Sequence, residues 1–278
     1  MTVGVVPERL LDVARRLSDV RGVVAVVLGG SRARGEHRAD SDVDLGVYYR
    51  GTLDMAGIRA LAAETADEVV GVYEPGQWGE WVHGGAWLRY DGVPVDWIYR
   101  PLDRVREIWE QCRRGRYEIG FQTGHPLGFY SHVYAGEVAL CRVLADPTGE
   151  VTGLREQARE YPAALGEALV AGAWEAGFMI EGASHGADPS YTAGCLFRGV
   201  GVLGQALYGR HRRWALNEKG LVDRAGRLPG APTDFARRAH RLLGAIGTTP
   251  AELAATLDAA RELVADTRAA LSVGGATA

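Results

Sequence analysis

Two aspartates in the stretch 29–49 have the spacing of a metal-binding pair. Asp42 and Asp44 are separated by one apolar residue, and the segment 41–49 alternates as a strand does. Residues two apart on a strand project to the same side, so the two carboxylates repel each other unless a cation lies between them. Small groups of oxygen ligands suit Mg²⁺, which takes its remaining ligands from water and substrate phosphates. The spacing therefore predicts a Mg²⁺ site on one face of this strand.

A glycine turn precedes the aspartates and is suited to hold an anion. Gly29, Gly30 and Ser31 follow the apolar run 23–28 and lead into a short predicted helix. Glycines let the backbone approach a phosphate, and the N–H groups at a helix start point toward an anion. The Ser31 hydroxyl is a further donor, and Arg34 is close in the chain. A lone sequence of this kind is usually only a turn, so its interpretation depends on the acids that follow it.

Asp96 is the candidate for a third acid. It lies in the segment 93–100, flanked by apolar residues of a predicted strand, where an unpartnered aspartate is poorly suited. A third carboxylate from a neighbouring strand would complete a two-metal site, with the ions about 3.5 to 4 Å apart. Each acid alone has a structural explanation, a solvated surface or a salt bridge. Their combination with the glycine turn favours phosphate chemistry, and Gly35 followed by Glu36 does not match a P-loop kinase.

The elements that must position these residues follow from hydrophobic periodicity. The β-branched run 23–28 predicts a buried strand, and 41–49 predicts a second one. Two further runs joined at Asp91-Gly92 predict a hairpin over 87–100, and Pro94 predicts that its second strand is irregular or at an edge early on. Helices are predicted over 7–20, 53–68 and 101–114.

The composition changes after about Gly149, where Ala, Leu, Glu and Arg replace the β-branched runs. Helices are predicted near 154–182, 190–209, 233–246 and 250–272, the last introduced by a segment with capping-box spacing. The sequence therefore predicts an α/β (α+β) chain. An N-terminal mixed sheet flanked by helices spans 1–148, and a C-terminal helical bundle spans 149–278.

Charge and cysteine content exclude several classes. The 278 residues carry a formal net charge of −4, which does not indicate a nucleic-acid groove. The three cysteines are far apart and form no C-x-x-C pair, so neither a disulfide framework nor a zinc site is predicted. No apolar run approaches the roughly 18 residues of a membrane span. We expect a cytoplasmic protein without membrane contact, as a monomer or a homodimer.

The order Gly29-Gly30-Ser31, Asp42-x-Asp44, then Asp96 on a later strand resembles the nucleotidyltransferase superfamily typified by the DNA polymerase β palm. The helical C-terminal half is similar to that of the small-molecule branch, which includes aminoglycoside adenylyltransferases. The stretches GHPLGFYSHVYAGEVAL and WALNEKG also resemble an actinobacterial group of nucleotidyltransferase-domain proteins.

The resemblance implies transfer of AMP, or another NMP, from ATP or another NTP to a hydroxyl of a small molecule such as an aminoglycoside-type antibiotic, with release of pyrophosphate. It implies that Gly29, Gly30, Ser31 and Arg34 hold the triphosphate and that two Mg²⁺ ions are bound by the aspartates. Asp42 and Asp44 would bind metal. Asp96 would bind the second metal or act as the base.

Some assignments stay open at this point. A glutamate serves as base in some members of the family, so Glu80, Glu118 and Glu137 remain alternatives to Asp96. Lys219, the only lysine in the chain, lies between predicted helices and could bind the leaving pyrophosphate, or it could be a solvated charge at a helix end. The acceptor could instead be a protein or a tRNA, or the chain could be a non-catalytic regulator. Intact carboxylates at all three positions disfavour the last alternative.

Overall fold

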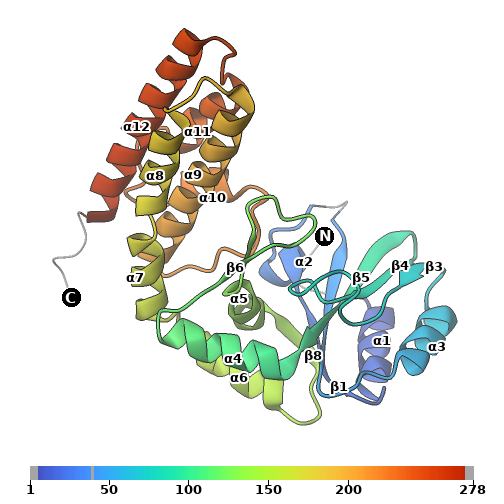
Figure 1. Ribbon diagram of the computed structural model, residues 1–278. Coiled ribbons are helices and arrows are strands. Elements are labelled where there is room, and N and C mark those ends of the chain that lie inside the picture. Colours follow the sequence, from blue (N-terminus) through green and yellow to red (C-terminus); the bar gives the residue numbers. More distant parts are fainter. Residues whose placement is uncertain (1–5, 39–40, 273–278) are drawn as a thin grey trace. The chain divides into compact units, whose positions relative to one another are not determined.

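The computed structural model describes residues 6–38 and 41–272 (Figure 1). Its contacts divide the chain into two compact units. The first holds the described residues up to Gln111 together with Tyr117–Glu160, and the second holds Cys112–Arg116 and the residues from Tyr161 onward. The change of composition near 149 thus precedes the change of unit, and the predicted domain limits 1–148 and 149–278 stay a prediction.

A six-stranded mixed sheet forms the centre of the first unit, as the sequence predicts. Its strands, in spatial order, are β3 (Glu68–Val72), β4 (Gly85–Tyr90), β5 (Val93–Pro101), β2 (Val43–Tyr49), β1 (Val23–Leu28) and β8 (Arg142–Ala145). β2 and β5 are parallel, whereas every other neighbouring pair is antiparallel. The two strands that carry the predicted acids are therefore direct neighbours near the middle of the sheet.

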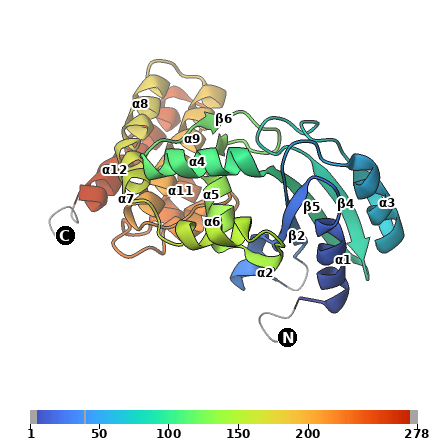
Figure 2. The ribbon, with the colours of Figure 1, turned by 90° about the horizontal axis from the view of Figure 1, so that it is seen from below.

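The alternation of β2 decides which face of the sheet is covered by the main core. Val43, Leu45 and Val47 are buried against α1 (Glu8–Ser18) and α3 (Met55–Thr65), which lie on this face (Figure 2). Asp44 and Gly46 therefore project to the opposite face. A strand with period-two polarity thus places its carboxylate away from the apolar core.

The hairpin of β4 and β5 has the turn that its sequence predicts. Asp91 and Gly92 both have positive φ, 52° and 76°, as a two-residue type I′ turn requires. Pro94 pairs with Arg89 of β4, whereas pairing with β2 begins only at Val95. β5 is thus an interior strand, and the proline lies in the short part that has a neighbour on one side only.

The first unit is completed by short elements, most of which show no clear periodic pattern of apolar residues. They are α2 (Gly30–Arg34), α4 (Leu102–Arg113), β6 (Ile119–Gly120), β7 (Phe129–Tyr130), α5 (Val133–Leu140) and α6 (Glu150–Ala158). Only α2 and α4 match elements predicted from sequence. α5 is buried on almost all sides, so it lacks the polar stripe by which an amphipathic helix is recognised.

The second unit is helical, as predicted. It contains α7 (Ala163–Ala171), α8 (Trp174–Ala183), α9 (Pro189–Arg210), α10 (Leu221–Ala225), α11 (Phe235–Gly244) and α12 (Pro250–Ser272). α9 packs against each of the other five helices of this unit. At the start of α12, Thr249 and Glu252 exchange side-chain to backbone hydrogen bonds, which confirms the capping box.

The stretch near 154–182 is helical, as predicted, and it is divided into α6, α7 and α8. The proline at 162 is predicted to start or kink a helix, and it is the N-cap of α7; a turn at Gly172–Ala173 separates α7 from α8. The stretch Ala163–Ala183 is, by length and composition, the one candidate membrane span among the described residues, with 33% of its best window buried. Core helices of soluble proteins pass the same test, so this is a weak indication.

Candidate active site

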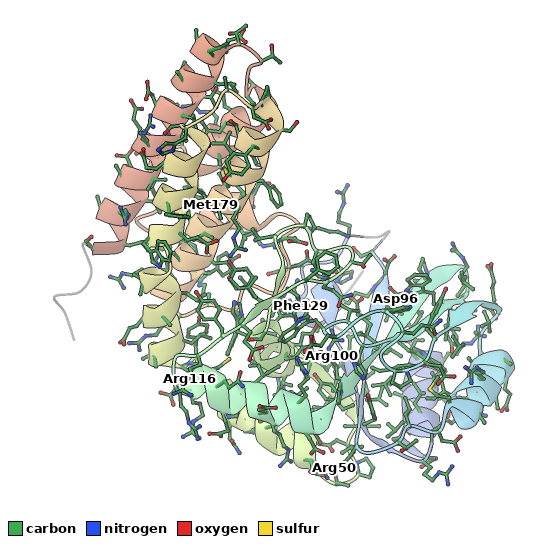
Figure 3. All side chains as sticks on the ribbon, viewed as in Figure 1. Arg50, Asp96, Arg100, Arg116, Phe129 and Met179 are labelled. Atoms are coloured by element: carbon green, nitrogen blue, oxygen red, sulfur yellow. The ribbon has the colours of Figure 1, made fainter. Side chains whose placement is uncertain are left out.

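Asp44 and Asp96 are side by side on the sheet. In the parallel pairing of β2 with β5, Asp44 lies directly opposite Asp96, and Asp96 is labelled on β5 in Figure 3. Neighbouring strands are about 4.8 Å apart, and opposite residues project to the same face. The structure therefore brings together two of the three acids that the sequence singles out.

Asp42 lies just before β2 and is exposed to solvent. It is two residues before Asp44 in the chain, and its negative charge contributes to raising the pKa of both Asp44 and Asp96. The three predicted acids thus share one region of the first unit, with Asp42 at its solvent side.

The electrostatics of this group are those of carboxylates that repel one another in a partly buried site. Burial raises the pKa of Asp96 to about 6, helped by repulsion from Asp44 and then Asp42. Burial is also the main cause that raises the pKa of Asp44, and repulsion from Glu137 and then Asp42 raises it further. Neither Asp44 nor Asp96 forms a salt bridge with any residue that the structure describes. A bound cation would relieve this repulsion.

The donor set fits Mg²⁺ in its usual mode of binding. Within the described ranges 6–38 and 41–272, no group of three or more His, Cys, Asp or Glu side chains is arranged to hold a metal ion by itself. Mg²⁺ is commonly bound through one or two carboxylates, with waters and substrate phosphates as the other ligands. Asp44 and Asp96 supply two such carboxylates, so the residues present fit a metal that arrives with a nucleotide.

The glycine turn lies directly against Asp44. The Gly29 N–H donates to the Asp44 carbonyl oxygen at 2.8 Å. Gly30 has a φ of +59°, and a Cβ atom there would be 1.8 Å from Asp44 Oδ2. Gly30 is therefore required twice, by its backbone conformation and by the space that the carboxylate occupies. Ser31 follows in α2 and is partly exposed.

Two arginines organise this turn. Arg32 donates to the carbonyl oxygens of Ser41 and Asp42, at 2.6 and 3.1 Å, and so holds the segment before β2 against α2. Arg34 donates to the Gly30 carbonyl at 2.8 Å and pairs with Glu36 at 2.9 Å. The positive charge of Arg34 also lowers the pKa of Asp44, although burial outweighs it. Arg34 is thus close to both the turn and the acid.

The three alternative glutamates occupy different environments. Glu137 of α5 accepts two hydrogen bonds from Arg100, at 2.7 and 2.8 Å, and its charge raises the pKa of Asp44. Glu80 pairs with Arg104 at 2.9 Å. Glu118 is exposed. Both oxygens of Glu137, the glutamate whose charge affects Asp44, are therefore occupied by a guanidinium.

Sequence reasoning missed Arg100, which is 4% exposed and, four residues after Asp96 on β5, lies on the same face of that strand. The alternation Asp96, Ile98, Arg100 is the signal that could have found it, because residues two apart share a face. Its aromatic neighbour is Tyr134, whose ring centroid is 5.0 Å from the guanidinium carbon.

Lys219 belongs to the second unit, between α9 and α10, and is exposed. Its backbone N–H donates to the Asn217 side chain at 2.8 Å, and its carbonyl accepts from Arg224 at 2.7 Å. These bonds fix the backbone of the loop and leave the function of the ammonium group a prediction.

Comparison with known proteins identifies the class. Residues 8–115, which include the glycine turn, Asp42, Asp44 and Asp96, match the family model of the nucleotidyltransferase domain. The chain therefore carries a nucleotidyltransferase domain, and it is an enzyme of that class with a nucleoside triphosphate as substrate. The resemblance drawn from the sequence is confirmed at the level of the superfamily.

Among solved structures, a nucleotidyltransferase-like protein from Exiguobacterium sibiricum matches at 10% sequence identity and a TM-score of 0.43. The match covers 90% of this chain and 72% of that one. None of the curated proteins compared with the chain matches it.

Proposed function

We propose that this enzyme transfers a nucleoside monophosphate, AMP in the first instance, from its triphosphate to a hydroxyl group of a small molecule in a Mg²⁺-dependent reaction. An aminoglycoside-type antibiotic is the acceptor we would test first. The observation that carries the proposal is the placement of Asp44 opposite Asp96, with the Gly29-Gly30 turn against Asp44.

Each residue has a distinct part in this reaction. The backbone N–H groups of the glycine turn, the Ser31 hydroxyl and Arg34 bind the triphosphate tail. Asp42 and Asp44 would hold one Mg²⁺ and Asp96 a second, and the metal would supply positive charge to the phosphate oxygens. The acceptor oxygen bonds to the α-phosphorus, the bond from that phosphorus to the pyrophosphate oxygen breaks, and pyrophosphate leaves with the bonding electrons.

Asp96 either binds the second metal or, without a metal on it, is the best candidate for the base that removes the acceptor's proton. In the metal-free site burial raises its pKa to about 6, so it is mostly ionised at neutral pH and still basic enough to accept a proton. Glu137 and Glu80 are each engaged by an arginine, so their carboxylate oxygens already have hydrogen-bond partners. Lys219 would add a positive charge to the leaving pyrophosphate.

A small acceptor is favoured over a nucleic acid. The formal net charge of −4 does not favour the basic surface that a tRNA needs. A protein acceptor, or a regulator that binds nucleotide without turnover, remains an outcome of the experiment. We propose a cytoplasmic enzyme that works as a monomer or a homodimer.

The test is incubation of the purified enzyme with ATP labelled at the α-phosphate, Mg²⁺ and separately kanamycin, streptomycin or spectinomycin. We expect label on one of these acceptors. Asp44→Asn should reduce the rate by at least about 100-fold, because it removes charge from the metal site. Asp19→Asn, an exposed aspartate at the end of α1, is the matched control and should keep the rate.

Full transfer by Asp44→Asn would overturn the assignment of the site. Label on the enzyme itself would indicate a protein acceptor, and nucleotide binding without any product would indicate a regulator.

A further inference from the structure

Trp87 stands in line with the site acids across the sheet. In the pairing of β4 with β5 it lies directly opposite Asp96, and Asp96 in turn lies opposite Asp44. On the far side of Asp44, Gly29 donates its N–H to the Asp44 carbonyl. The order across the sheet is therefore Trp87, Asp96, Asp44, Gly29, with the three side chains on one face.

The exposure of Trp87 is unusual for its position. β4 has a hydrogen-bonded neighbour on each side, yet Trp87 is 42% exposed, whereas Trp97 on the opposite face of β5 is fully buried. Trp87 is not isolated, because Trp78 and Tyr73 lie against it, and a contiguous aromatic cluster beside polar groups is typical of a binding surface.

Two aromatic residues fix the indole of Trp87 in place. Trp78 stacks on it with ring centroids 5.0 Å apart, and Tyr73 meets it edge-on at 5.2 Å. We call Tyr73, Trp78 and Trp87 the aromatic platform. A Cβ atom at Gly85 would meet the Trp97 carbonyl oxygen at 2.0 Å and the Trp78 ring at 3.1 Å, so Trp78 also lies close against the β4 backbone. The platform is thus rigid before any ligand binds, which reduces the entropy cost of binding.

The position of the platform indicates which substrate it serves. The triphosphate belongs at the Gly29 end of the line, and Asp96 receives the acceptor's proton in the proposed reaction. The next side chain beyond Asp96 is Trp87, with Cα atoms of opposite residues about 4.5 to 5.5 Å apart. A six-membered ring whose face lies on the indole would therefore bring a ring hydroxyl to Asp96.

We propose that the aromatic platform binds the acceptor, and that the acceptor is a hydroxylated saturated ring, a pyranose or a cyclitol, whose apolar C–H face stacks on Trp87. Amino groups on such a ring gain further from the indole face. This inference rests on the proposed function, which sets the triphosphate at the Gly29 end of the line and the acceptor at the Trp87 end.

Binding experiments test it without relying on transfer. The probes are kanamycin, streptomycin and spectinomycin, each titrated calorimetrically into enzyme saturated with Mg²⁺ and α,β-methylene ATP. We expect at least one to bind wild type, Trp87→Ala to bind it about 10- to 100-fold more weakly, and Trp87→Phe to stay within about 3-fold. The affinity for α,β-methylene ATP should be unchanged in both variants.

A footprint on wild-type enzyme guards against misfolding of the variants. Oxidation by N-bromosuccinimide, read by mass spectrometry, should reach Trp87 and the control Trp174, which is 57% exposed on α8. The bound ring compound should protect Trp87 alone, beyond the protection given by the nucleotide analogue.

Three results would overturn the platform. The first is a Trp87→Ala variant that loses affinity for the nucleotide analogue but not for the ring compound. The second is that no probe binds the wild-type enzyme below about 10 mM. The third is that the bound ring compound does not protect Trp87 from oxidation. Transfer of AMP to a ring compound with these binding results would leave the proposed function standing. Ring binding without transfer would leave the platform standing instead.

Discussion

Arg100 of β5 and Glu137 of α5 form a two-bond ion pair beside Asp44. Arg100 is 4% exposed, and its Nε and Nη2 atoms are 2.7 and 2.8 Å from the two carboxylate oxygens. The pair joins the central sheet to the helix on the face that carries the acids. It also keeps the negative charge of Glu137 from acting on Asp44 unopposed, because Arg100 lowers the pKa of Asp44 while Glu137 raises it.

Breaking this pair should destabilise the protein. Arg100→Met leaves Glu137 partly buried without a partner, and we expect a loss of about 2 to 4 kcal/mol in the free energy of unfolding. Urea denaturation followed by tryptophan fluorescence measures it. Arg16→Met, which breaks a pair with the exposed Glu64, is the control and should cost less than about 1 kcal/mol. A similar loss of unfolding free energy in both variants would show that the Arg100–Glu137 pair stabilises the protein no more than an exposed pair does.

Gly30→Ala should affect the site more than the fold. The new methyl group would meet Asp44 Oδ2, so we expect the transfer rate to fall by at least about 100-fold. Gly51→Ala is a matched control, because Gly51 has nearly the same φ, +61°, and a methyl group added there would have nothing within 4 Å. Both variants should lose about 1 to 2 kcal/mol of stability from backbone strain. Equal rates in the two variants would contradict the contact with Asp44.

The stability of the metal-free enzyme should depend on Asp96. Its pKa is raised to about 6 in the folded protein, against an ordinary value near 3.9, so the folded state binds this proton more tightly. Stability therefore falls as the pH rises from about 4 to about 6 and levels off above that range. In EDTA, Asp96→Asn should have a higher Tm than wild type at pH 7.5 and nearly the same Tm at pH 4. A lower Tm of Asp96→Asn than of wild type at pH 7.5 would contradict the destabilising burial and charge repulsion of the Asp96 carboxylate.

Mg²⁺ with a nucleotide should reverse that order. A cation near Asp96 favours its ionised form, so the ligands should raise the Tm of wild type by more than that of Asp96→Asn at pH 7.5. Thermal unfolding with and without Mg²⁺ and α,β-methylene ATP measures the difference. Ca²⁺ in place of Mg²⁺ shows whether the effect needs the smaller ion. Equal shifts in the two proteins would remove Asp96 from the metal site.

Lys219→Ala should raise the KM for ATP about 5- to 10-fold if its ammonium group binds the pyrophosphate. Lys219→Arg keeps the positive charge and should recover most of the affinity. Steady-state kinetics of the two variants, with Tm as the check on folding, separate this function from that of a solvated charge. An unchanged KM in Lys219→Ala would exclude it.

The sequence predicted those parts of the fold that local pattern controls. Strands β1 and β2, the turn at Asp91-Gly92 and the helical second half follow from β-branched runs, alternation and caps. α5 and β8 were missed, because α5 is apolar on nearly every side and β8 has only four residues. Neither has a period long or clean enough to stand out.

The site shows the same division. The residue types of Asp42, Asp44 and Asp96 could be selected from sequence, but the pairing of Asp44 with Asp96 depends on a parallel contact between strands far apart in the chain. The partnership of Arg100 with Glu137, and the line from Trp87 to Gly29, depend on that register as well. Local pattern carries no information about such long-range geometry.

The parallel pairing of β2 with β5 has a consequence for how the enzyme matures. Side chains alternate along a strand, so a slip of one residue between these two strands would turn the carboxylate at 96 toward the apolar layer and bring Trp97 out in its place. A misassembled chain could keep its secondary structure and still be inert. Enzymatic turnover is thus a more stringent reporter of correct assembly than circular dichroism for this protein.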